Sequence, residues 1–235
     1  LPILVFFVLV TIDSNAQNTR FSFSEHKMGS PLNIIFYAQD SVIAKKQARA
    51  SFHLIDSLNH IFSNYDSSSE LTSINNNAGI AKNIASPLMW ELITQSKEAY
   101  IKSKGAYNIA LGPLTHLWRT ARRSKQFPTQ LQIKNILILC DFNKIQLNNQ
   151  DHSIYLSLKG MQLDFGGIGK GYAAERAKQV MQTAGVMNGV VNASGDLTTW
   201  GRQANGEKWT IGIVNPAHVN SIFSYMNVSG LSVAT

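Results

Sequence analysis

Residues 163–173 read LDFGGIGKGYA, and the six positions from 166 to 171 hold four glycines and Lys170. The apolar run around Leu163 predicts a short strand before these glycines. A glycine-rich turn between a strand and a helix lets the backbone approach a ligand, and the first turn of such a helix favours anions. A nucleotide or phosphate site is therefore the first hypothesis for this segment.

The residues after this turn predict a helix and then a second strand. Apolar positions recur with the helical period at Ala173, Ala177, Val180, Met181 and Ala184. Gly185 stands where a helix commonly ends. The two valines at 190–191 predict a buried strand, which leads into a second turn of small residues, NASGD at 192–196.

Two nucleotide-binding motifs can be compared with these glycines. A Walker A loop requires Ser or Thr after its lysine, whereas Lys170 is followed by Gly171, so this motif fails. The dinucleotide fingerprint G-x-G-x-x-G/A is met by Gly169, Gly171 and Ala174. Three small residues at this spacing recur by chance, so a nicotinamide-dependent Rossmann enzyme and a purely structural turn are both alternatives.

The composition is that of a globular protein with one sizeable core or two small ones. The chain has 235 residues, of which 44% are hydrophobic and 15% charged. Strands are predicted at 32–38, 144–147, 153–158, 209–213 and 223–228, and helices at 41–63 (capped by Asp40 or Ser41) and 87–104 (capped by Ser86). A loop is predicted at 65–70, and Gly112-Pro113 is predicted to start a turn that leads into residues 115–122. This mixture predicts an α/β or α+β fold in one domain.

The start of the chain predicts a secretory signal. Residues 1–16 hold an apolar run of about 12 residues, too short to span a bilayer, and small residues at 14–16 that a signal peptidase reads. We expect cleavage after Ala16, leaving 17–235 as the mature domain; a buried N-terminal strand is the alternative. No Met precedes Leu1, so we expect the chain to be incomplete at its start. The single Cys140 excludes an internal disulfide, which fits export to the periplasmic side of a bacterial inner membrane.

The charge balance is basic. The formal net charge is +7, and removal of residues 1–16 takes away only Asp13, which raises it to +8. Such a balance fits nucleic acid, an anionic membrane surface or an anionic small ligand. The one dense basic cluster consists of Arg119, Arg122, Arg123 and Lys125. No aromatic platform is interleaved with it, so we interpret it as a solvated loop and expect no nucleic-acid partner; peripheral association with the membrane surface is one further expectation.

Six ordered blocks of sequence resemble the ApbE family of flavin transferases. They read MGS at 28–30, YDSSSELTSIN at 65–75, GAYNIALGPL at 105–114 with LW at 117–118, LDFGGIGKGYA at 163–173, VNASGD at 191–196 and WTIGIVNP at 209–216. Together they cover nearly all of residues 28–235. One such block would be a coincidence, whereas six in the same order identify the chain as a member of this family.

The resemblance implies a fold and an activity. The fold would be a single ApbE-like domain, similar to T-folds, with mixed sheets and flanking helices. The activity would be that of an enzyme, an FAD:protein FMN transferase, which uses Mg²⁺, moves the FMN phosphoryl group of FAD to a threonine hydroxyl of a flavoprotein acceptor and releases AMP. Such a transfer needs positive or N–H groups, and a metal ion, around the phosphate oxygens.

The resemblance also implies roles for individual residues. Contacts with FAD are implied for Met28, Tyr65, Asn108, Ile109, Ala110, Asp164 and Lys170, and the carbonyl of Gly167 would be a Mg²⁺ ligand. No catalytic residue is assigned. Mg²⁺ prefers oxygen ligands, Lys170 would be a point charge near the pyrophosphate, and Asp164 would bond an adenine or ribose edge. The alternatives are that Tyr65 covers a helix end, that Asp164 satisfies turn amides and that Lys170 is solvated.

The chain departs from the family pattern in two places. Asn108 and Ala110 stand where the family usually has Asp and Thr, which puts the FAD contacts there in doubt. A flavin-binding module without transfer is therefore an alternative, as is an FAD pyrophosphatase in which water replaces the threonine. The chain also ends at Thr235, before the His-Ile and Asp-Ala-x-x-Thr motifs that supply metal ligands in the family. We expect residues 1–235 alone not to transfer FMN, although the complete protein would.

Overall fold

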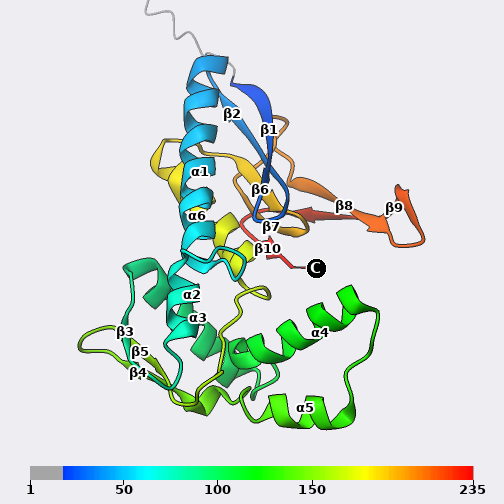
Figure 1. The fold of residues 1–235 in the computed structure, drawn as a ribbon. Helices are drawn as coiled ribbons and strands as arrows, with labels where there is room; N and C mark the ends of the chain where they lie inside the picture. Colours follow the sequence, from blue (N-terminus) through cyan, green and yellow to red (C-terminus); the bar gives the residue numbers. More distant parts are fainter. Residues whose placement is uncertain (1–17, 235) are drawn as a thin grey trace, which may run out of the picture.

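The computed structural model of the protein describes residues 18–234, which form two lobes (Figure 1). The sheet lobe contains residues 18–62 and 169–234, and the helical lobe contains residues 70–160. One hydrophobic cluster runs through both lobes, from Phe36 in the sheet lobe to Met89 in the helical lobe. The prediction of an α/β or α+β fold, with sheets and flanking helices, is confirmed.

The sheet lobe is built on a five-stranded sheet with the order β1-β2-β6-β7-β10. Its strands are β1 (Thr19–Lys27), β2 (Ser30–Ala38), β6 (Gly189–Ala193), β7 (Asp196–Trp200) and β10 (Ser232–Val233). Every neighbouring pair in this sheet is antiparallel. A Rossmann site requires parallel strands joined through a crossover helix, so the fingerprint at Gly169, Gly171 and Ala174 does not mark a Rossmann fold.

Two helices cover one face of this sheet, α1 (Ser41–Phe62) and α6 (Gly169–Thr183) (Figure 1). The Asp40 side chain accepts from the amides of Val42 and Ile43 at 2.8 and 2.9 Å, so the predicted cap is confirmed. The buried face of α1 carries Ala44, Ala48, Phe52, Ile55, Leu58 and Phe62. That periodic apolar stripe is what holds a helix of this length on the sheet.

A separate hairpin lies against the other face of the sheet, β8 (Trp209–Asn215) and β9 (His218–Val228). Trp209 donates from its indole nitrogen to the carbonyl of Trp200 at 2.9 Å. A small cluster joins Trp209 and Val228 of the hairpin to Val190 of β6. The strands predicted at 209–213 and 223–228 are confirmed, and both extend beyond those residues.

The helical lobe comes from the middle of the chain. Its elements are α2 (Glu70–Asn76), β3 (Asn83–Ile84), α3 (Pro87–Lys102), η1 (Ile109–Leu111), α4 (Gly112–Ser124), α5 (Gln130–Leu137), η2 (Phe142–Lys144), β4 (Ile145–Asn148) and β5 (Ser153–Leu156). Ser86 caps α3 through the amide of Met89, and Pro87 occupies its first position, as predicted. Helix α2 was not predicted; Ser69 caps it through the amide of Thr72 at 3.0 Å.

The basic cluster predicted as a loop belongs to helix α4 and its C-terminal end, which corrects that interpretation. Proline follows Gly112 at the start of the helix, and Lys125 ends it in the left-handed conformation. Trp118 and Phe127 lie beside the cluster with their ring centroids 6.3 Å apart. The interpretation failed because Gly112 and Pro113 were taken as the start of a turn, whereas Pro113 lies in the first turn of the helix.

The strand predicted around Leu163 is absent, although the chain there is buried in an alternating pattern. Met161, Leu163 and Phe165 are buried, and the residues between them are partly exposed. The segment pairs with no strand of residues 18–234. Instead, the Asn75 side chain accepts from the Leu163 amide at 2.7 Å and donates to the Leu163 carbonyl at 3.1 Å. The side-chain amide of Asn75 therefore supplies the backbone hydrogen bonds of Leu163 that a neighbouring strand would otherwise supply.

The N-terminal prediction lies outside the described part of the chain. Residues 1–16, read as a secretory signal, fall within the stretch that the structure does not describe. Among the residues that are described, no helix combines the length and apolarity needed to cross a membrane.

Replacing Asn75 by Ala tests the role of the two hydrogen bonds between its side chain and the backbone of Leu163. The change leaves the buried amide and carbonyl of Leu163 unpaired, so we expect Asn75→Ala to lower the free energy of unfolding by about 2 to 4 kcal/mol. The matched control is Asn76→Ala, at the exposed next position of the same helix. Urea unfolding followed by circular dichroism measures both variants. Equal stability of the two variants would contradict the account.

Candidate active site

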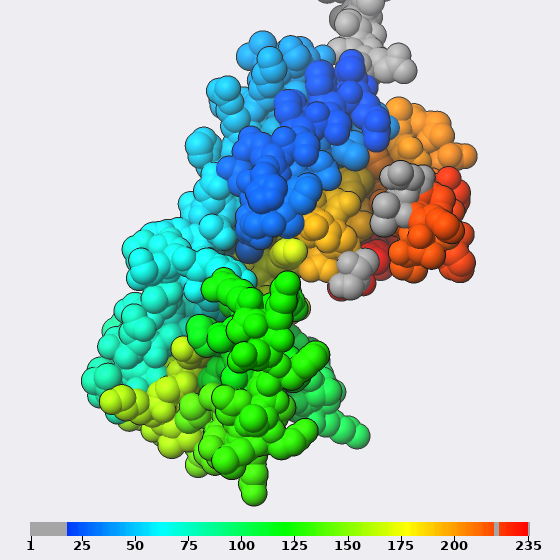
Figure 2. Space-filling model, turned by 45° about the vertical axis from the view of Figure 1, so that its right-hand side comes forward, coloured from blue at the N-terminus to red at the C-terminus, as the bar shows by residue number. Residues whose placement is uncertain are grey.

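A cleft of about 660 Å³ lies between the two lobes. Figure 2 shows the hollow between the green middle segments and the blue and gold segments above them. The residues that line it are Met28, Gly29, Asn59, Phe62, Ser63, Asn64, Tyr65, Arg119, Asp164, Phe165, Gly166, Gly169 and Lys170. They come from four segments far apart in the sequence. Four of the seven FAD contacts implied by resemblance line this cleft: Met28, Tyr65, Asp164 and Lys170.

Met28 reaches the cleft from a tight hairpin turn. It connects β1 to β2 together with Gly29, and Lys27 pairs with Ser30 across the turn. Both turn residues have positive φ, 50° for Met28 and 73° for Gly29. A two-residue turn of this kind matches the twist of the strands but strains a residue other than glycine. The hairpin therefore holds the Met28 side chain at the cleft in a fixed position.

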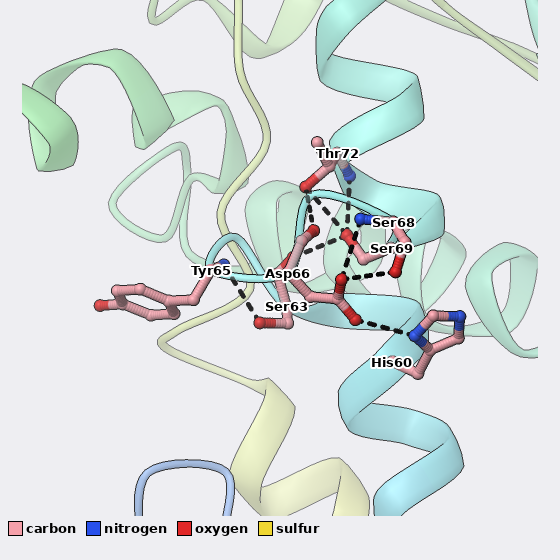
Figure 3. A network of polar contacts seen from close by, with 7 residues as sticks. All are labelled: His60, Ser63, Tyr65, Asp66, Ser68, Ser69 and Thr72. Atoms are coloured by element: carbon pink, nitrogen blue, oxygen red, sulfur yellow. Dashed lines mark hydrogen bonds and ion pairs between the residues drawn. The ribbon is translucent and has the colours of Figure 1, made fainter.

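Tyr65 lies on the loop between α1 and α2, which a polar network holds in place (Figure 3). Asp66 accepts from the hydroxyl of Ser68 at 2.6 Å and from its amide at 2.8 Å, and it contacts His60 Nδ1 at 2.8 Å. The two bonds from Ser68, with a smaller contribution from His60, lower the pKa of Asp66 from 3.8 to about 2. The network fixes the loop backbone, while the Tyr65 ring points away from it and is 75% exposed.

Arg119 and Asp164 form an ion pair inside the cleft. The distance from Arg119 Nη2 to Asp164 Oδ2 is 3.0 Å, and the Asp164 side chain is only 10% exposed. The guanidinium also lies over the Tyr65 ring, 4.9 Å from its centroid. Asp164 Oδ1 accepts from the amide of Gly166 at 2.7 Å. Asp164 thus satisfies a turn amide, as one alternative predicted, and it also binds an arginine.

Arg119 was not among the residues implied by resemblance. The sequence placed it in the basic cluster, and the only pointer was its position directly after the Leu-Trp pair at 117–118. Helix α4 turns it into the cleft, whereas Arg122 lies one turn further along the helix and does not line it.

Lys170 stands in the first turn of α6, where the glycine-rich segment becomes helical. Ile168 precedes the helix and provides no side-chain cap. The first amides of an uncapped helix carry partial positive charge and favour anions. Lys170 lines the cleft beside Gly169 and makes no ion pair within the described part of the chain. This end of the cleft therefore favours a phosphate group.

Asn108, Ile109 and Ala110 lie behind the cleft and do not line it. Ile109 is 1% exposed and Ala110 is fully buried. The Asn108 side chain caps the turn through the amide of Ala110 at 2.8 Å and donates to the Cys140 carbonyl at 2.8 Å. The carbonyl of Ile109 accepts from the amide of Asp164 at 2.9 Å, so this turn supports Asp164 from below. Direct contact of these three residues with FAD stays a prediction.

Gly167 lies on the exposed part of the turn, between Asp164 and Lys170. A Mg²⁺ ion usually takes several oxygen ligands, including one or two carboxylates. Within residues 18–234, however, no group of three or more His, Cys, Asp or Glu side chains could hold a metal ion. The nearby carboxylate, Asp164, is paired with Arg119. Binding of Mg²⁺ by the Gly167 carbonyl therefore stays a prediction.

The second turn of small residues has a structural role. Ser194 and Gly195 have positive φ, and Asn192 accepts from the amide of Gly195 at 2.8 Å, which closes the hairpin between β6 and β7. None of residues 192–196 lines the cleft.

Comparison with known proteins decides the family. The model of the ApbE family matches residues 28–235 of this chain. The chain belongs to the ApbE family. A curated FAD:protein FMN transferase from Klebsiella pneumoniae is 29% identical over 221 residues, which cover 94% of this chain and 67% of the relative. One from Escherichia coli (strain K12) is 26% identical over 77% of this chain and 53% of its own length.

Solved ApbE structures share the fold. The apo form of the flavinyl transferase ApbE from Pseudomonas stutzeri has a TM-score of 0.81 at 21% identity, covering 92% of this chain and 67% of that chain. The apbe protein from Thermotoga maritima has a TM-score of 0.83 at 21% identity, covering 91% and 69%. The chain thus spans between about half and two thirds of the length of the curated relatives named above.

The network under Tyr65 predicts a pH dependence of stability. Asp66 has a lower pKa in the folded chain than its ordinary value of 3.8. Its contribution to stability is therefore present above pH 3.8 and is lost as the pH falls toward about 2. We expect the free energy of unfolding to fall less steeply over this range in Asp66→Asn than in the wild type. Urea unfolding at a series of pH values measures it.

Ser68→Ala and His60→Ala separate the causes of the shift. Because the bond from the Ser68 hydroxyl is the largest single cause of the shift, Ser68→Ala should raise the pKa of Asp66 more than His60→Ala does, although the amide at position 68 still donates. Carboxyl carbon shifts in NMR report this pKa directly. The reverse order would show that the ion pair with His60 dominates, against this account.

Proposed function

We propose that the protein containing this chain is an FAD:protein FMN transferase. The observation that carries the proposal is the cleft between the lobes, in a chain whose curated relatives are named FAD:protein FMN transferase. The cleft combines apolar and aromatic walls with two cations, Arg119 and Lys170. Its volume lies within the range of pockets for small molecules and cofactors, about 300–1,000 Å³.

Each wall of the cleft fits one part of FAD. The exposed ring of Tyr65 and the thioether of Met28 offer apolar surface to the ring systems of the dinucleotide, and the buried rings of Phe62 and Phe165 back this wall from the core. Lys170 and the uncapped start of α6 offer positive charge to its pyrophosphate. The chain's own residues would thus bind and orient the substrate before transfer.

The proposed reaction moves the FMN half of FAD. The oxygen of an acceptor threonine forms a bond to the phosphorus of the FMN half, and the bond from that phosphorus to the bridging oxygen breaks. AMP leaves with the bridging oxygen, and the hydroxyl proton passes to solvent. Positive groups around the phosphates stabilise the charge that develops during such a transfer. The acceptor would be a flavoprotein with a threonine that can reach the cleft.

The proposal includes a requirement for Mg²⁺, which rests on the resemblance, and a location outside the cytoplasm, which rests on the N-terminal sequence. Mg²⁺ would neutralise phosphate charge when bound, with the Gly167 carbonyl as one ligand. We derive no step through the ion, because the described residues hold no cluster of three or more His, Cys, Asp or Glu side chains for it. The apolar N-terminal run supports export to the periplasmic side of the inner membrane, where the protein would associate peripherally with the membrane surface.

Incubation of the protein with FAD, Mg²⁺ and a flavoprotein acceptor tests the proposal. Mass spectrometry of the acceptor and chromatography of the nucleotides distinguish the outcomes. Transfer gives AMP and an acceptor heavier by FMN. An FAD pyrophosphatase gives AMP and free FMN, a flavin-binding module gives neither product, and both of these results would contradict the proposal.

Lys170→Gln should slow the transfer. Loss of a charge-assisted contact to phosphate should reduce kcat/KM for FAD by about 10- to 100-fold. Lys134→Gln, an exposed lysine of α5 that does not line the cleft, is the matched control and should leave kcat/KM unchanged. An unchanged rate in Lys170→Gln would favour the alternative that Lys170 is only a solvated residue.

A further inference from the structure

Arg119 connects three separate segments at the cleft. It extends from α4 in the helical lobe, pairs with Asp164 on the glycine-rich turn and lies over the ring of Tyr65 on the loop after α1. Its side chain is 30% exposed, so it remains open to the cleft that it lines. No other arginine or lysine among the described residues both lines this cleft and forms an ion pair there.

The guanidinium has donors left for a ligand. An arginine carries several N–H groups arranged as a planar fork. In the described structure a single hydrogen bond uses one of these groups, from Nη2 to Asp164 Oδ2 at 3.0 Å. The contact with Tyr65, 4.9 Å from the guanidinium carbon to the ring centroid, acts through the charge of the group. Arg119 can therefore donate to a further acceptor without breaking either contact.

Lys170 indicates which ligand the free donors of Arg119 would bind. Both cations line the same cleft, and they approach it from different lobes, Arg119 from α4 and Lys170 from the start of α6. Two cations and one carboxylate leave the cleft with an excess of positive charge, so an anion is the ligand that they fit. The fork of arginine binds two oxygens of a phosphate at once, whereas lysine acts as a point charge.

We propose that Arg119 is a specificity-determining residue that binds the pyrophosphate of the dinucleotide while it remains in contact with Asp164 and Tyr65. The inference rests on the proposed function and deepens it. The protein then selects FAD over flavins without phosphate through a contact between the lobes. In the alternative, Arg119 only holds Tyr65 and Asp164 in place and never touches the ligand.

Two pairs of ligands distinguish direct binding of the pyrophosphate by Arg119 from a role in which it only positions Tyr65 and Asp164. FAD and ADP contain a pyrophosphate, whereas riboflavin and adenosine contain the same ring systems without phosphate. Titration calorimetry with FAD and riboflavin, and ligand-observed NMR with ADP and adenosine, measure affinity in the wild type, Arg119→Gln and Arg119→Lys. The complete protein is used, and Arg122→Gln on the same helix is the matched control, because Arg122 is exposed and does not line the cleft.

We expect Arg119→Gln to weaken binding of FAD and ADP by about 10- to 100-fold, while riboflavin and adenosine change by less than about 3-fold. Arg119→Lys should lie between, because it keeps the charge and loses the fork. Arg122→Gln should match the wild type for all four ligands. Thermal unfolding of each variant checks that the fold is intact.

Other outcomes overturn the inference or the function separately. If Arg119→Gln lost equal affinity for ligands with and without phosphate, Arg119 would act only through Tyr65 and Asp164. If it lost no affinity, Arg119 would have no role in binding. Either result overturns the inference and leaves the transferase proposal standing. A wild type that binds ADP through Arg119 but not FAD would overturn the proposed function instead. A wild type that binds neither ligand would overturn both.

Discussion

The two hydrogen bonds between the Asn75 side chain and the backbone of Leu163 are the constraint on which the site depends. They hold a buried, extended segment that has no strand beside it. This segment runs between the lobes and carries Asp164, and the glycine-rich turn follows directly. Gly112 lies so close to the Gln162 carbonyl that any side chain there would collide with it. The cleft is thus formed where one unpaired segment is clamped from α2 and from the start of α4.

The cleft gains its chemistry from the ends of regular elements and from the loops between them. A hairpin turn supplies Met28, the end of α1 and its following loop supply Phe62 and Tyr65, and the start of α6 supplies Lys170. These positions leave amides and side chains free to face a ligand, which the middle of a helix or sheet would not. Arg119 is the exception, since it stands within α4 and reaches the cleft by its length.

The sequence predicted what is determined locally. Asp40 before α1 and Ser86-Pro87 before α3 are capping patterns whose partners lie within three residues, so both helices were predicted with nearly correct ends. Leu163 was misread as a strand because its partner, Asn75, lies 88 residues away. Arg119 was missed for the same reason: Asp164 is 45 residues away, and no local pattern connects the two. The turn at 108–110 was implied by resemblance to touch FAD, and the structure places it beneath Asp164.

We propose that FAD lies in the cleft between α4 and the turn at 164–170. A crystal structure of the complete protein with FAD tests it most directly. The account predicts pyrophosphate oxygens within hydrogen-bonding distance of Lys170 Nζ and of the Arg119 guanidinium, with Asp164 and Tyr65 still beside the arginine. FAD bound outside this cleft, or with its pyrophosphate turned away from both cations, would contradict the account.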